Sequence, residues 1–175
     1  MNESQILKLS PATAWRIGKD LLIRLLIPEI GVAALVLHNE GHIDFFTIII
    51  VFIVFLFIHS PTLYLYFEYI ILSFGKFYEV SSAGIRVNNG SLIPIEDFDH
   101  IELVLSLSRS NKDIFDYIGL RNYYYALIFL KNKRAIGPIT CLQSKHLDKD
   151  LELLKGTHLI IRASFIPDAW PNYEL

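Results

Sequence analysis

The chain has 175 residues, which is about the length of one domain with an appendage. Hydrophobic residues make up 53% of it and charged residues 19%, so the composition favours a membrane protein and excludes an intrinsically disordered chain. The formal net charge of -2 disfavours a nucleic-acid-binding protein, and the single cysteine, Cys141, excludes an internal disulfide and a multi-cysteine metal site.

A first apolar segment, at about residues 20–38, predicts a membrane span that three residues interrupt. These residues are Arg24, Pro28 and Glu29. Arg24 lies near the start, where its long side chain reaches the lipid headgroups, whereas Glu29 lies deeper and needs a polar partner. A helix lying on the membrane surface is the alternative, but the short linker 38–44 favours a hairpin that crosses.

A second segment, Phe45–Ile58, contains no charged residue and is interrupted only by Thr47. At 1.5 Å per residue it covers about 21 Å, less than the roughly 30 Å of a hydrocarbon core, so we expect the span to extend over about residues 44–65. Pro61 lies in that extension. Because proline has no N–H to donate, it predicts a kink there.

The charges that flank the two spans predict that both termini are cytoplasmic. The linker carries no lysine or arginine, and such residues concentrate on the cytoplasmic side of membrane proteins. The flanks carry Lys8, Arg16, Lys19 and Arg24 before the first span, and Lys76 and Arg86 after the second. We therefore expect residues 1–74 to form an N-terminal flank and a transmembrane hairpin. Within it, three residues are candidates for polar contacts inside the membrane: Arg24, Glu29 and His59.

Residues 75–175 predict a small α+β domain, with a C-terminal tail, on the cytoplasmic side. Short apolar segments separated by turn residues predict strands at 77–82, 84–95, 98–107, 123–131, 134–142 and 158–165. Asn88, Asn89 and Gly90 predict a hairpin turn within the second segment, and Asn132 and Lys133 predict another. One short helix is expected after Ser144, ending at Gly156, with Leu147, Leu151 and Leu154 on its apolar face.

Two closely spaced membrane helices followed by the segment YEVSSAGIRVNNGSLIPIEDFDHIEL resemble the bacterial pleckstrin-homology (PH-like) membrane proteins. The resemblance covers roughly residues 40–142, and it rests on an order of apolar and turn positions: Tyr78, Val80, Ile85, Gly90, Ile93, Pro94, Ile95, Phe98 and Ile101. It implies a curved antiparallel sheet of about six strands, closed by the helix after Ser144, in a protein of the bacterial inner (plasma) membrane. It also implies a role in membrane organisation, oligomerisation or partner binding, without catalytic residues. The strand expected after the helix departs from the family pattern.

Two surfaces of this domain could contact partners. Tyr123 and Tyr125 share one face of a predicted strand and could hold a protein partner, although the same pattern fits packing within the sheet. The tip of the predicted hairpin around residue 132 is basic and could touch anionic lipid, or it could be an ordinary solvated turn. Its charged residues are Lys131, Lys133 and Arg134.

No sequence motif indicates a catalytic, cofactor-binding or metal site. The acidic stretch of Glu96, Asp97, Asp99 and Glu102 alternates as a half-buried strand does, and Cys141 lies in an apolar strand where an inert thiol is expected. We therefore expect a non-enzymatic, membrane-anchored binding or scaffold protein that acts through the PH-like domain, with a protein partner or a second copy, no cofactor and no nucleic acid. The alternative is an immunity-type protein, or a subunit of a larger membrane complex, that acts through the hairpin.

Overall fold

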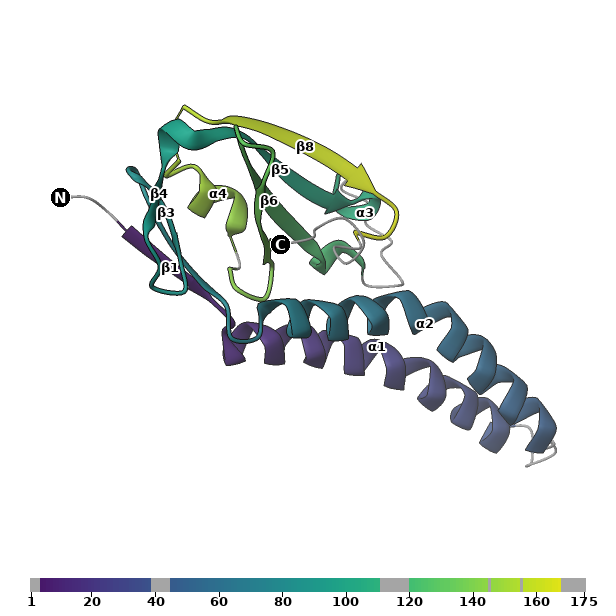
Figure 1. Cartoon of the computed structure of the whole chain (residues 1–175). Coiled ribbons are helices and arrows are strands. Elements are labelled where there is room, and N and C mark those ends of the chain that lie inside the picture. The colour runs from purple at the N-terminus through teal and green to yellow at the C-terminus, as the bar shows by residue number, and fades with distance from the viewer. Residues whose placement is uncertain (1–3, 39–44, 111–119, 145, 155, 168–175) are drawn as a thin grey trace.

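A long helical hairpin projects from an α+β domain with two sheets (Figure 1). The computed structural model describes residues 4–38, 45–110, 120–144, 146–154 and 156–167. The hairpin consists of α1 (Pro11–His38) and α2 (Phe45–Ser73). Both helices extend beyond the predicted spans on the side of the domain. α1 starts where it does because the Ser10 hydroxyl accepts from the Thr13 N–H at 3.4 Å and Pro11 occupies the first helical position.

The predicted kink in α2 is confirmed. Its two parts, Ile48–Phe57 and His59–Ser73, are inclined to each other by 49°. Pro61 cannot donate to the Phe57 carbonyl, and the Ser60 hydroxyl donates to that carbonyl at 2.8 Å instead. Among the described residues, no unbroken helix is long and apolar enough to cross a bilayer, whereas the two parts of α2 together have the required length and composition.

The first sheet is antiparallel and includes a strand that precedes the hairpin. Its order is β1 (Ser4–Lys8), β2 (Phe77–Ser81), β3 (Gly84–Val87) and β4 (Leu92–Pro94). β1 pairs with β2 from Ser4 opposite Ser81 to Lys8 opposite Phe77. The predicted turn after β3 is confirmed, because Asn88 and Asn89 have φ angles of 49° and 60°. β1 was not predicted, because residues 4–8 lie in the segment expected to be an N-terminal flank.

The second sheet is mixed. Its order is β7 (Ala135–Thr140), β6 (Tyr124–Leu130), β5 (Phe98–Ser106) and β8 (His158–Ser164). Short helices connect the elements: η1 (Ile95–Asp97), α3 (Leu107–Ser110), η2 (Leu120–Asn122) and α4 (Leu147–Leu151).

The α+β class is confirmed, but the strands form two sheets rather than one curved antiparallel sheet. β8 runs parallel to β5, because the chain crosses over through α4 before it rejoins the sheet. α4 is also shorter than predicted and begins after His146. The Ser144 hydroxyl accepts from the His146 N–H and donates to the Asp150 carboxylate, so Ser144 stabilises the turn that leads into the helix.

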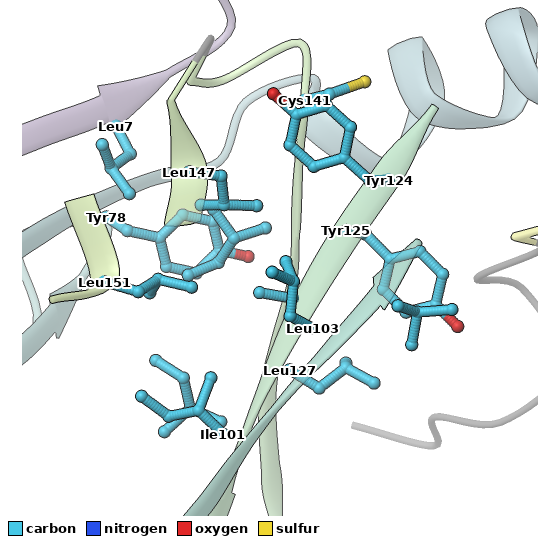
Figure 2. Close-up of a cluster of buried hydrophobic side chains, with 14 of the residues drawn as sticks. Leu7, Tyr78, Ile101, Leu103, Tyr124, Tyr125, Leu127, Cys141, Leu147 and Leu151 are labelled. Carbon is cyan, nitrogen blue, oxygen red and sulfur yellow. The ribbon is translucent and has the colours of Figure 1, made fainter. Parts of the chain in front are cut away.

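One hydrophobic core joins both sheets, α4 and the inner ends of the hairpin helices. In Figure 2, Leu7, Tyr78, Leu147 and Leu151 gather on one side of β6, and Tyr125 lies on the other. β6 is buried on both faces, since its alternating side chains from Tyr124 to Ile128 are all in the core. That burial explains why its sequence is continuously apolar rather than alternating.

Gly84 is required by the close approach of β3 and β4. Its φ angle is +145°, and a Cβ there would overlap the backbone carbonyl of Ile93. We expect Gly84→Ala to lower the free energy of unfolding by about 3 kcal/mol, measured by thermal melting in detergent. Gly75→Ala is the matched control. Gly75 also has a positive φ, +70°, but beyond its chain neighbours no atom lies within 4 Å of the position that an alanine Cβ would take. This substitution should therefore lower the free energy of unfolding by only about 1 kcal/mol. Equal losses would contradict the steric explanation.

Candidate functional site

The two tyrosines proposed as a partner surface lie inside the protein. Tyr123 and Tyr125 are 1% and 4% exposed. Their rings contact Tyr69 of α2 edge to face, with centroid distances of 5.5 and 6.3 Å. The alternative was packing within the sheet, and the rings do pack inside the protein, although their partner is α2 of the hairpin rather than a strand.

Polar contacts complete this junction between the hairpin and the domain. The hydroxyls of Ser73 on α2 and Thr140 on β7 are 2.6 Å apart and buried. The Tyr69 hydroxyl donates to the Pro167 carbonyl at 2.7 Å, which ties the end of the described chain to α2. The inner part of α2 is thus a core element of the domain.

The structure places Arg24 of α1 near His59 of α2, close enough for the Arg24 charge to act on the His59 ring. The Arg24 Nε atom lies 2.9 Å from the Asp20 carboxylate, one helical turn earlier on α1. His59 is 5% exposed, and its ring lies 4.3 Å from that of Phe55. The side chain of Glu29 lies outside the described residues, so its predicted contact stays a prediction.

The basic tip formed by Lys131, Lys133 and Arg134 is exposed. The predicted turn is present, and Lys133 has a φ of 67°. β7 leads from this tip to Thr140, which contacts α2. The tip therefore lies at the opposite end of β7 from its contact with the hairpin, about 20 Å away, which favours a solvated turn over the predicted contact with anionic lipid.

A cluster of charged side chains fastens the edge strand β8 to the sheet. The Glu102 carboxylate on β5 accepts from Arg162 on β8 at 2.7 Å and lies 3.3 Å from the His100 ring. Asp99 lies 2.8 Å from the other nitrogen of that ring, which stacks on Phe129. Two residues of the acidic stretch, Asp99 and Glu102, thus take part in a cluster of polar contacts that reaches from β5 to β8.

A pocket of about 450 Å³ lies where α1 meets the domain, and we name it the basal pocket. Its lining comes from α1, α3, η2, β6 and the segments around α4: Arg16, Ile17, Asp20, Arg109, Asn122, Tyr124, Cys141 and His146. The pocket could not be predicted from the sequence. Arg16 has the pattern of a flanking charge, and no local signal links it to Arg109, because the pocket forms only where α1 lies against the domain.

Two arginines give the basal pocket its electrostatic character. The Arg109 guanidinium lies over the Tyr124 ring, 3.8 Å from its centroid, which fixes its position. Burial raises the pKa of the Tyr124 hydroxyl to about 12, and the Asp148 carboxylate acts in the same direction. Arg109 and Arg16 act in the opposite direction, so both of these positive charges lie near the hydroxyl. In the part of the chain that the structure describes, neither arginine forms an ion pair with a carboxylate.

Asp20 is the carboxylate that lines the basal pocket, and its charge is already compensated. One of its oxygens accepts from Arg24 and from the Asn122 amide, both at 2.9 Å. The pocket therefore presents two arginines whose charge its own acid does not neutralise. Such a site suits an anion rather than a cation. Over the described residues, no three potential metal ligands are grouped anywhere.

Comparison of the chain with family models, with curated proteins and with solved structures found no match.

Cys141 lines the basal pocket, and we expect its thiol to be unreactive. Burial raises the pKa of its thiol to about 12, from an ordinary value of 9.0. At pH 8 the thiolate, the form that alkylating agents attack, is therefore about a thousandfold scarcer than for a free cysteine. We expect iodoacetamide to leave the native protein unmodified and to label it after unfolding in sodium dodecyl sulfate, as read by mass spectrometry. Rapid labelling of the native protein would show that the thiol is accessible.

Proposed function

We propose that the protein is a membrane-anchored, non-enzymatic binding protein of a bacterial inner membrane, with a helical hairpin in the bilayer and a PH-like domain on the cytoplasmic surface. The main observation in support of this proposal is that large apolar side chains are exposed on all sides of α2 in the outer part of the hairpin. They are Phe45, Phe46, Phe52, Phe57 and the aliphatic residues between them at 48–51, 53, 54 and 56. A helix that is apolar all round suits lipid rather than water.

The length of α2 supports a membrane span. Exposed apolar side chains follow one another from Phe45 to Phe57, and from Leu65 onward one face of α2 is buried in the domain while Phe67 and Ile71 on it remain exposed. The two parts of α2, Ile48–Phe57 and His59–Ser73, together have the length and composition that a span requires. The outer part of α1 also exposes apolar side chains, at Leu22, Ile23, Leu26, Ile27 and Ile30.

The first sheet supports the proposed orientation. β1 precedes α1 and β2 follows α2, and the two strands pair directly. The chain therefore leaves and re-enters the domain at one place, as a hairpin with both ends on the same side of a membrane must do. The basic residues Lys8, Arg16 and Lys19 lie on that side, which favours the cytoplasm.

Because Tyr123 and Tyr125 are buried, a partner would bind at an edge of one of the sheets instead. β8 is the exposed edge of the second sheet, and Ile161 on it is 60% exposed. An extended segment of another protein, or of a second copy, would add a strand there.

Insertion of the hairpin is tested by placing charges in it. Ile49→Lys with Ile53→Lys puts two ammonium groups near the middle of the span, at a cost of about 3 kcal/mol each. We expect the wild-type protein to stay in the membrane pellet after alkaline carbonate extraction and the variant to leave it. Ile6→Lys with Leu92→Lys, which changes two exposed apolar residues of the domain, should behave as wild type. Release of the wild-type protein by carbonate would overturn the proposal.

Orientation is tested with a cysteine at the basic tip. Asn132→Cys provides an exposed thiol, while the native Cys141 is buried. We expect a membrane-impermeant maleimide to label this variant only after spheroplasts are opened. Labelling of intact spheroplasts would place the domain on the outer face.

A further inference from the structure

We infer that the basal pocket binds the phosphate group of an anionic phospholipid headgroup, with Arg16 and Arg109 as its cationic ligands. The inference rests on the proposed function for the source of the phosphate, because the proposed membrane surface places such headgroups beside the pocket. The pocket chemistry itself fits any phosphate monoester or diester.

The position of the pocket along α1 supports a headgroup. If the span begins at about residue 20, Arg16 lies about one helical turn, or 6 Å, outside the hydrocarbon core. Trp15, next to Arg16, is 69% exposed, and tryptophan favours the membrane interface. The pocket opening thus lies at the depth of the lipid phosphates.

The charges of the pocket match one phosphate. Arg16 and Arg109 form no ion pair with a carboxylate among the described side chains, whereas Asp20 is held by Arg24 and Asn122. A guanidinium group presents two parallel N–H donors to phosphate oxygens. Tyr124 holds the Arg109 guanidinium at one place, so little ordering is needed when the anion binds.

The size of the pocket fits a headgroup and not a whole lipid. About 450 Å³ lies within the range of pockets that hold small ligands, and the acyl chains would remain in the bilayer. The PH-like resemblance does not supply this site, since Arg16 and Asp20 lie before the residues that carry the resemblance.

The test compares the binding of different lipids to the full-length protein in nonionic detergent. Native mass spectrometry would measure binding of phosphatidylglycerol and phosphatidylcholine, and calorimetry would measure binding of inorganic phosphate. We expect phosphatidylglycerol to bind more tightly than phosphatidylcholine, and Arg16→Gln with Arg109→Gln to weaken it about tenfold or more. Arg16→Lys with Arg109→Lys, which keeps the charge, should restore part of the affinity.

The control variant removes the same charge elsewhere. Lys133→Gln with Arg134→Gln deletes two cations from the basic tip at the far end of β7, and we expect it to bind as wild type. An equal loss in this variant, or no loss in the arginine variant, would overturn the inference. Binding of inorganic phosphate that depends on both arginines, without lipid selectivity, would support the phosphate site and assign it to a soluble phosphate compound.

Carbonate extraction of the same proteins separates the two proposals. The arginine variant should remain in the membrane, because the hairpin carries the insertion. Release of the wild-type protein would contradict the proposed membrane anchor. Calorimetry would still measure whether the basal pocket binds inorganic phosphate.

Discussion

The contact of Tyr69 with Tyr123 and Tyr125 is the interaction on which the rest of the structure depends. It makes the inner part of a helix, whose outer part is apolar on all sides, a member of the domain core. β6 is then buried on both faces, against α4 and the first sheet on one side and α2 on the other. The inner part of the hairpin and the domain therefore share one close-packed core.

This shared core fixes the position of the domain relative to the hairpin, and so relative to the proposed membrane. α2 ends at Ser73 and β2 begins at Phe77, so no long linker separates them. The bond from Asn122 to Asp20 ties α1 to the domain as well. The basal pocket is held close to the span, whereas the basic tip is held away from it, although both carry positive charge. Position in the fold, rather than charge alone, distinguishes the two surfaces.

Local features of the structure could be predicted from the sequence, and contacts between distant segments could not. The bend at Pro61, the turn at Asn88 and Asn89 and most strand positions follow from short-range chemistry. β1 could not be found, because five residues with one buried side chain, Leu7, carry no alternating pattern. The burial of the tyrosine face depends on a helix more than fifty residues away along the chain. The basal pocket likewise unites arginines that are distant in the sequence.

The pairing of β1 with β2 also constrains how the protein is made. β1 is synthesised first, but its partner emerges from the ribosome only after both hairpin helices. For a hairpin inserted as proposed, a chain that crossed the membrane only once would leave the two strands on opposite sides, and the first sheet would stay incomplete with Leu7, Tyr78 and Val80 uncovered. If the hairpin inserts as proposed, completion of this sheet would depend on the correct membrane topology, and wrongly inserted chains would present exposed core residues to quality-control proteases.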